Sequence, residues 1–341
     1  MEKARFYTKI LFLGLFAAFL AFSCKKSSDD DEDDKEYVGG TLTFSLPAYS
    51  SPGDTYELVP TGAYTTDGSS IGYCWTSTLN ESVRDTTKHI GDPDSFTGAY
   101  TLNIPEDFYG SITVTCYAFA DGYYTRTQAS VTVVIDPESS LSVTGWLPEN
   151  KKFTDPRDSR AYRYTTIGGR DWFMQNLAYE SGKPYYNLEA LRDLFGGFYT
   201  WDEARTVCPE GWRLPTEEDW MNLAESLTGN TPESYSAFGG ISGDLMARAY
   251  FNDDQMWPFS PYVTITNSSL FCALPCGYAL VKDGTFVFSG FNDYSTYWVD
   301  QESGSEKAYY RYLYNNSPDV LVATAYKEYF ATNVRCVRDA E

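Results

Sequence analysis

The sequence is poor in histidine and in basic residues. Its 341 residues contain one histidine, His89, and 26 lysines and arginines against 47 aspartates and glutamates. Nucleic-acid binding is therefore not expected, because that affinity comes largely from Lys and Arg on phosphates. The single imidazole also removes the usual partner of a zinc-binding or nucleophilic cysteine. We therefore expect no metal, no cofactor and no catalytic residues, and interpret His89 as a loop residue.

The apolar run at the N-terminus is short. It covers residues 10–22, follows three basic residues and ends at small ones, which is typical of a secretory signal rather than a membrane span. The tetrapeptide Ala21-Phe22-Ser23-Cys24 resembles a bacterial lipobox, which implies cleavage before Cys24 and lipidation of that cysteine. The stretch after it, Lys25-Lys26-Ser27-Ser28 and six acidic residues, resembles the export signal of surface lipoproteins in Bacteroidetes-type bacteria.

These features predict a protein of the outer membrane, displayed at the cell surface and attached by its lipid anchor only. The alternative is a lipoprotein retained on the periplasmic side, in which the acidic stretch is a solvated spacer. Without residues 1–23 the formal charge becomes −23. The remaining chain is long enough for two cores.

Changes in composition divide the chain into five segments. We expect a signal peptide at 1–23, a lipidated acidic tether at 24–37, a β-sandwich at 38–136, a linker at 137–150 and a second domain at 151–341. Alternating segments separated by turn signals predict the sandwich. Its expected strands are 41–46, 55–60, 71–76, 98–104, 111–118 and 129–135.

Two segments of this first domain, Tyr73-Cys74-Trp75 and residues 110–118, resemble strands C and F of an immunoglobulin-like or PKD-like module. The resemblance implies an all-β stalk in which Trp75 packs between two sheets. It also places Cys74 and Cys116 on neighbouring strands. A disulfide between them is expected in an exported protein.

The second domain shows helix signals as well as alternating segments. Thr200 and Glu203 form a capping box, and the helix they start runs to about Cys208, before Pro209. A second helix begins after Thr216 with three acidic residues, buries a stripe from Trp220 to Leu227 and ends at Gly229. A weaker helix is expected at 188–194. Residues beyond 270 alternate like strands, so an α+β domain is predicted.

Five motifs occur in one order along residues 160–339. They are Ile167-Gly168-Gly169-Arg170-Asp171-Trp172 with Asn176-Leu177, Tyr199-Thr200-Trp201, Cys208-Pro209-Glu210-Gly211-Trp212-Arg213-Leu214-Pro215, Ala273-Leu274-Pro275 and Val334-Arg335-Cys336-Val337. Together they resemble the Fibrobacter succinogenes major paralogous domain, and more distantly a C-type-lectin-like fold. The resemblance implies a Cys208–Cys336 disulfide. We interpret the segment from Cys208 to Pro215 as scaffold, in which Arg213 has an internal acidic partner, rather than as a ligand loop.

Cys272 and Cys276 leave three alternatives open. Positions four apart in a strand lie roughly 13 Å apart, too far for a disulfide unless Pro275 bends the chain. A local disulfide, two buried thiols or a bond to another chain remain.

Ligand contacts are expected on the loop face of the lectin-like domain. The candidates are Asn292, Asp293, Tyr294, Tyr297, Trp298, Tyr310 and Tyr312. The aromatic members, with Phe286, Phe288 and Phe291, either stack on sugars or pack beneath long loops. The chain lacks the tripeptides of calcium-dependent lectins, and Asn292-Asp293 is either a calcium-binding remnant or a turn. Residues 309–316 alternate like a strand with one tyrosine-rich face.

These observations favour a non-enzymatic surface protein for adhesion or binding, whose partners are glycans or surface and matrix proteins. A structural or accessory subunit of an outer-membrane assembly is the alternative. A glycoside hydrolase with two carboxylates is the third hypothesis, although no motif places two acids in a defined cleft.

Overall fold

The computed structural model describes residues 35–79, 98–136 and 140–340. The chain is rich in strands and has few, short helices, as the sequence predicts. Among the described residues, none of the helices is long and apolar enough to cross a membrane. The predicted lipidation site Cys24, the acidic stretch and His89 lie outside the described residues.

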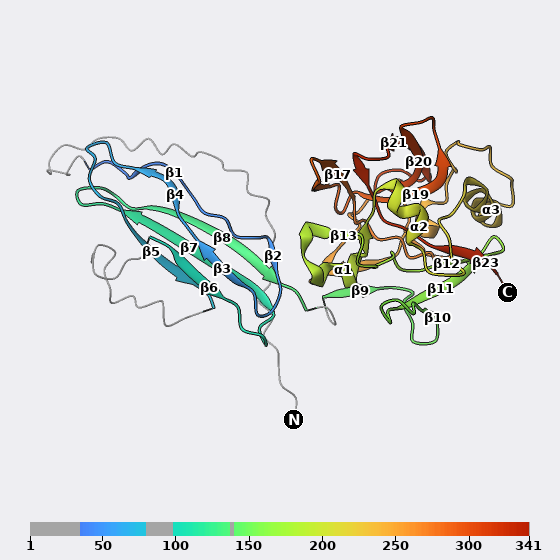
Figure 1. Cartoon of the computed structure of the whole chain (residues 1–341), viewed down its shortest axis with the longest axis horizontal. Coiled ribbons are helices and arrows are strands. Elements are labelled where there is room, and N and C mark those ends of the chain that lie inside the picture. Colours follow the sequence, from blue (N-terminus) through green and yellow to red (C-terminus); the bar gives the residue numbers. More distant parts are fainter. Residues whose placement is uncertain (1–34, 80–97, 137–139, 341) are drawn as a thin grey trace, which may run out of the picture.

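The N-terminal part, residues 35–136, consists of strands in two layers (Figure 1). One layer is a four-stranded sheet of order β2-β8-β7-β5, and the other contains the pairs β1-β4 and β3-β6. The strand bounds are β1 Gly39–Thr43, β2 Tyr49–Ser50, β3 Thr55–Leu58, β4 Thr61–Tyr64, β5 Gly72–Ser77, β6 Tyr100–Asn103, β7 Gly110–Phe119 and β8 Arg126–Val134.

Alternating burial along β7 shows why this region is a two-layered β structure. Ile112, Val114 and Cys116 point inward and are fully buried, while the residues between them face outward. Trp75 packs in the same core, edge-on to Phe44 at 5.0 Å between ring centroids. The inward position expected for this tryptophan is therefore observed.

The predicted Cys74–Cys116 disulfide is wrong: both cysteines are free. The strands are neighbours as expected, but the register pairs Cys74 with Tyr117 and Trp75 with Cys116. Directly paired residues point to the same face and successive residues to opposite faces. The Cys116 thiol therefore lies in the core, and the Cys74 thiol lies on the outer face.

The predicted linker at 137–150 is not a separate connection. Within it, β9 (Leu141–Val143) pairs with β15 (Ala249–Phe251), so it belongs to a sheet of the C-terminal part. Tyr49 of the N-terminal part contacts the ring of Phe251 at 5.8 Å between centroids. Ile135 and Val143 are buried in one apolar cluster with residues of the C-terminal part. The two parts thus share a packed junction.

The helices expected in the C-terminal part begin and end close to the expected residues, as α1 Glu189–Phe195, α2 Trp201–Val207 and α3 Glu217–Thr228. The short helix α4 Ser242–Leu245 and the 3-10 turn Tyr185–Asn187 were not expected. The Thr200–Glu203 capping box is present, and the Thr200 amide donates to the Glu203 carboxylate at 2.8 Å. Thr216 caps α3, and Gly229 ends it in the left-handed conformation.

The strands of this part form several small sheets, and Figure 1 draws α1 and α3 at opposite outer sides of the part. The sheet orders are β10-β11-β12-β23, β13-β14, β16-β15-β9, β18-β17-β22 and β19-β20-β21. The remaining bounds are β10 Lys151–Thr154, β11 Ala161–Ile167, β12 Arg170–Phe173, β13 Lys183–Pro184, β14 Gly197–Phe198, β16 Asp254–Gln255, β17 Tyr278–Lys282, β18 Thr285–Ser289, β19 Tyr294–Glu302, β20 Lys307–Tyr314, β21 Leu321–Tyr326, β22 Phe330–Ala331 and β23 Val337–Asp339.

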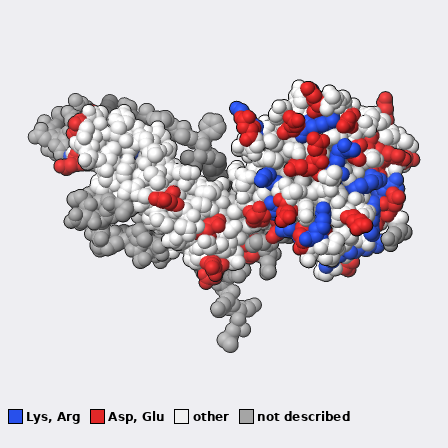
Figure 2. All heavy atoms as spheres, in the orientation of Figure 1, with Lys and Arg blue, Asp and Glu red and all other residues white. Residues whose placement is uncertain are grey.

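Charged side chains are unevenly distributed. On the face drawn in Figure 2, acidic and basic residues gather on the C-terminal part, while the visible described surface of the N-terminal part is mainly uncharged.

Candidate functional site

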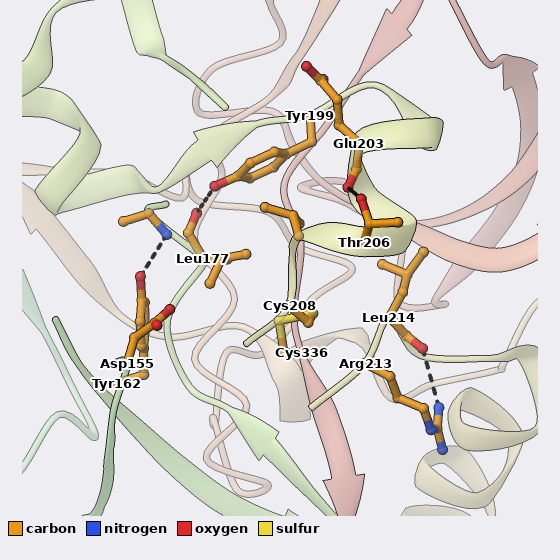
Figure 3. Close-up of a disulfide and its surroundings, with 12 residues drawn as sticks. Asp155, Tyr162, Leu177, Tyr199, Glu203, Thr206, Cys208, Arg213, Leu214 and Cys336 are labelled. Atoms are coloured by element: carbon orange, nitrogen blue, oxygen red, sulfur yellow. Dashed lines mark hydrogen bonds between the residues drawn. A yellow bond between two sulfur atoms is a disulfide. The ribbon is translucent and has the colours of Figure 1, made fainter. Parts of the chain in front are cut away.

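A disulfide fixes the frame of the C-terminal part. Cys208 at the end of α2 is bonded to Cys336, just before β23, as the family resemblance implied. Figure 3 draws this bond together with its surroundings, among them Tyr199, whose hydroxyl donates to the Leu177 carbonyl at 3.3 Å. The bond joins positions 128 apart in sequence. It therefore holds the end of α2 next to the start of β23.

The segment after Cys208 serves as scaffold. Arg213 and Val337 exchange backbone hydrogen bonds of 2.9 Å in both directions, which extends the sheet at β23. Trp212 packs on Phe173 with 4.2 Å between ring centroids. The Arg213 side chain pairs with Asp219, which is the internal acidic partner expected from sequence.

The sheet β19-β20-β21 carries the tyrosine-rich face expected for residues 309–316. On β20, Tyr310, Tyr312 and Tyr314 lie on one face, while Arg311 and Leu313 are buried on the other. The register places Tyr294 opposite Tyr314. We use the name tyrosine face for Tyr278, Tyr294, Tyr310, Tyr312 and Tyr314, which are all half-buried.

The rings of the tyrosine face form a continuous row. Tyr294 stacks on Tyr314 at 4.9 Å between centroids and lies 6.3 Å from Tyr312. Tyr312 lies 5.6 Å from Tyr310, and Tyr278 lies 6.1 Å from Tyr294. Only Tyr294 and Tyr314 are stacked, and the other neighbouring rings are tilted or edge-on to each other. Each ring combines an apolar body with a polar hydroxyl, so the row is amphipathic.

The hydroxyls of this row are available for hydrogen bonds. Among the described residues, none accepts from or donates to the hydroxyls of Tyr294, Tyr310, Tyr312 and Tyr314. Burial raises the pKa of Tyr310 to about 12, with a smaller contribution from neighbouring tyrosines. Burial also raises the pKa of Tyr294. These two hydroxyls therefore stay protonated at physiological pH and can both donate and accept.

A buried ion pair holds the tyrosine face from behind. Arg311, between Tyr310 and Tyr312 in sequence, is fully buried and pairs with Glu217 of α3. Its guanidinium also lies over the Phe238 ring at 3.7 Å and donates to the Ser236 carbonyl at 2.6 Å. This ion pair thus connects β20, which carries Tyr310, Tyr312 and Tyr314, to α3.

Two predicted ligand residues are wrong. Tyr297 and Trp298 are completely buried, so neither ring can contact a ligand on the surface. Tyr297 packs on Phe271 in the core behind the sheet, and the Trp298 indole nitrogen donates to the Tyr199 carbonyl at 2.9 Å. β19 is covered on both faces over Ser295–Val299, unlike a strand with one exposed face.

The phenylalanines of the same segment also pack inward. Phe288 contacts Tyr185 and Phe198 at 5.0 and 5.2 Å between centroids, and Phe291 lies 4.9 Å from Tyr185. Phe286 packs against the same apolar cluster. Of the two expectations for this aromatic segment, inward packing therefore applies to the phenylalanines. Tyr294 is half-buried and remains partly accessible.

Asn292 and Asp293 form an exposed turn at the end of the tyrosine face. Asn292 adopts a left-handed conformation with φ 68°, and Asp293 accepts a hydrogen bond of 2.6 Å from Asn315. Within the described residues, no group of three or more His, Cys, Asp and Glu side chains could hold a metal ion. These two exposed side chains add polar groups at this end of the tyrosine face.

Sequence reasoning missed a second aromatic element next to this border. Phe259 is 90% exposed and Tyr262 is 65% exposed. They lie on the loop between β16 and β17, and Ser260 donates to Asn316 at 2.9 Å. The prolines at 258 and 261 were the available signal for a loop, but only the tertiary contact places this loop beside Asn316.

Cys272 and Cys276 are free and buried, which selects the second of the three alternatives. Burial raises the pKa of the Cys276 thiol to about 12, although Arg335 opposes the shift. Arg335 is fully buried and donates to the carbonyls of Phe271 and Cys272 at 2.6 and 2.9 Å. This arrangement is structural packing around the Ala273-Leu274-Pro275 motif.

The C-terminal part is thus a disulfide-linked α+β domain with an amphipathic face on one small sheet. Residues 146–338 match the Fibrobacter succinogenes major domain family, and the chain belongs to this family. No curated protein matches the chain. Among solved structures, the Yersinia pseudotuberculosis adhesin InvE is similar over 89% of this chain and 70% of its own, with 12% identity and a TM-score of 0.21. A likeness at this level carries no inference about fold or function.

Proposed function

We propose that the protein is a non-enzymatic, lipid-anchored receptor of the cell surface that binds glycans or proteins through the tyrosine face. An immunoglobulin-like stalk, carried from the membrane by the acidic tether, presents a C-type-lectin-like head. The observation that carries the proposal is the row of half-buried tyrosines whose hydroxyls have no partner among the described residues.

The chemistry of this face suits recognition. Tyrosine supplies large contact area at a small cost in side-chain entropy, and its hydroxyl both donates and accepts. The buried ion pair behind β20 holds the rings in place before a ligand arrives. Such preorganisation improves affinity because less freedom is lost on binding. Asp293 and Asn315 add hydrogen-bonding groups at the edge.

The test is a screen of the folded, exported chain on arrays of glycans and of surface and matrix proteins, with and without a calcium chelator. We expect selective binding to one ligand class that weakens at least several-fold in a Tyr310→Phe/Tyr312→Phe double variant. Tyr309→Phe is the matched control, because Tyr309 lies on the opposite face of the same strand and stacks on Tyr235.

Each outcome separates the possibilities. Binding lost in the double variant and kept in the control supports the tyrosine face. Binding equally affected by Tyr309→Phe, or unaffected by either change, would remove the face from the proposal. Loss of binding on chelation would show that the contact depends on calcium.

A further inference from the structure

Among the described residues, no other segment forms backbone hydrogen bonds with the outer edge of β21 over three of its residues. The inner edge faces β20, and the register pairs all six residues of β21 with that strand. Just beyond the strand, in the same register, the Lys327 amide donates to the Glu306 carbonyl at 3.0 Å. Counting back from Lys327 in steps of two, the residues that exchange hydrogen bonds with β20 are therefore Ala325, Ala323 and Leu321. In an antiparallel ladder the N–H and C=O groups of alternate residues point to opposite sides. Those of Val322, Thr324 and Tyr326 therefore point away from β20.

The chain itself begins to cover this edge and then leaves it. Val320, which has the outward parity, exchanges two backbone hydrogen bonds of 2.9 Å with Phe238. In an antiparallel continuation Ser236 would lie opposite Val322. Instead, the Ser236 carbonyl accepts from the buried Arg311, and the Tyr235 amide donates to Glu217 at 2.8 Å. Residues 235–236 thus bond to the two members of the ion pair instead of to β21. The pairing of this segment with the edge therefore ends at Phe238.

The open stretch lacks the usual protection of an edge strand. Natural edges carry charged residues, proline or bulges that prevent pairing with another chain. Leu321-Val322-Ala323-Thr324-Ala325-Tyr326 contains no charge and no proline, and its register with β20 is regular. Figure 1 draws β21 at the outside of the C-terminal part, next to β20. An unprotected edge of this length is a template for another strand.

We propose that β21 is a strand-addition site that receives an extended segment of a partner polypeptide. The added strand would become the fourth of the sheet β19-β20-β21 and pair with the outward groups of Val322, Thr324 and Tyr326. On one face its side chains would lie beside Leu321 and Ala323, next to the tyrosine face. Affinity would come from main-chain hydrogen bonds and specificity from these alternate side-chain positions.

Charge favours a different protein over a second copy of this chain. The chain has a formal net charge of −21, so two copies repel each other at the distances that strand pairing requires. At the Tyr326 end of the strand, the exposed Glu306 and Glu328 lie next to Lys307 and Lys327, and Lys327 pairs with Glu302. The acidity of the chain as a whole, rather than this end of the strand, therefore makes a basic segment the expected partner. This inference rests on backbone groups and is independent of the ligand of the tyrosine face.

The test uses peptides selected from a random displayed library on the full chain, with counter-selection on a Thr324→Pro variant. The Thr324 amide points outward, so proline removes one pairing donor without breaking a bond to β20, and edge strands tolerate proline. Thr324→Val is the matched control, because it keeps the amide and the strand propensity. We expect selected peptides to lose about tenfold or more in affinity with Thr324→Pro and little with Thr324→Val.

Two further measurements keep the test independent of whether the proline variant folds. An added strand pairs with β21 through the N–H groups of every second residue. N-methylation of those residues should abolish peptide binding, whereas N-methylation of the residues between them should not. The amides of Val322, Thr324 and Tyr326 should exchange rapidly in the free chain and slow down with peptide. The proposal is overturned if no peptide discriminates the variants, if N-methylation has no effect, or if these amides are already protected. A dimer of this chain that Thr324→Pro dissociates would overturn the choice of partner. Peptide binding that survives Tyr310→Phe/Tyr312→Phe separates this site from the tyrosine face.

Discussion

Replacing Glu217 by Gln should destabilise the C-terminal part far more than an equivalent change one residue away. Glu217 and Arg311 are both buried, and Gln preserves shape and the acceptor for the Tyr235 amide but removes the negative charge. Arg311 would then be left as a buried cation without a counter-charge, surrounded by neutral acceptors such as the Ser236 carbonyl and by the Phe238 ring.

The magnitude follows from the burial of the pair. Removing one partner of a buried ion pair typically costs about 3–5 kcal/mol, because the remaining charge stays desolvated. Glu218 is exposed in the same first turn of α3. Glu218→Gln loses only its interaction with the helix dipole, about 0.3–1 kcal/mol. For a domain of this size, the Glu217→Gln loss corresponds to a fall in Tm of about 10 °C.

The assay is equilibrium unfolding in urea, followed by tryptophan fluorescence, because five tryptophans of the C-terminal part are fully buried. An Arg311→Met variant and the Glu217→Gln/Arg311→Met double variant complete a mutant cycle. We expect the double variant to cost less than the sum of the single variants by about 2 kcal/mol. Equal costs for Glu217→Gln and Glu218→Gln, or strict additivity, would refute the reasoning.

Three other predictions follow from the ionisable and sulfur-containing groups. Burial alone would raise the pKa of Asp219, but hydrogen bonds from Arg213, the Thr216 backbone and Arg170 outweigh it and lower the pKa to about 2. The associated stabilisation, about 2 kcal/mol, is complete above pH 4 and is lost as the pH falls toward 2, and an unchanged pH profile of Tm in Asp219→Asn would contradict this. Reducing Cys208–Cys336 should lower the free energy of unfolding by about 5 kcal/mol in the chain-entropy model, measured by denaturation with and without reductant; a loss below 1 kcal/mol would argue against it. In the native protein a thiol reagent should modify Cys74 before the three buried cysteines, slowly because burial raises its pKa, whereas protection of Cys74 until reduction would restore a disulfide there.

The sequence predicts best what local chemistry determines. The caps at Thr200 and Thr216 and the glycine at 229 place α2 and α3 within a residue or two, because a cap is set by neighbouring side chains. Alternation likewise locates the longer strands of the N-terminal part. It misses β2, which has two residues and pairs in parallel with β8, far away in sequence. It also misses β4, which follows closely after β3 and pairs with β1.

What sequence cannot supply is which side of a strand becomes core. On β19 aromatic residues occupy both parities, with Tyr294 and Trp298 on one and Tyr297 on the other. Both faces of β19 are covered over most of the strand, so these aromatic residues are mainly core. In the sequence alone, aromatic residues at both parities look the same as an aromatic run on the surface. The Cys74–Cys116 prediction fails for a related reason, because neighbouring strands bring cysteines together only when the register also places them on the same face.

The parity of β20 gives the whole face a simple mutational logic. Arg311 and Leu313 belong to the core and are fully buried, so changes there should alter stability first. Tyr312 and Tyr314 belong to the surface, where changes should alter binding while the fold is kept. Tyr310 shares both roles, since its ring lies 4.9 Å from the Phe330 ring and extends the row to Tyr312. A scan of β20 should therefore separate into two classes with Tyr310 between them, and a scan without this division would mean that the tyrosines are packing residues only.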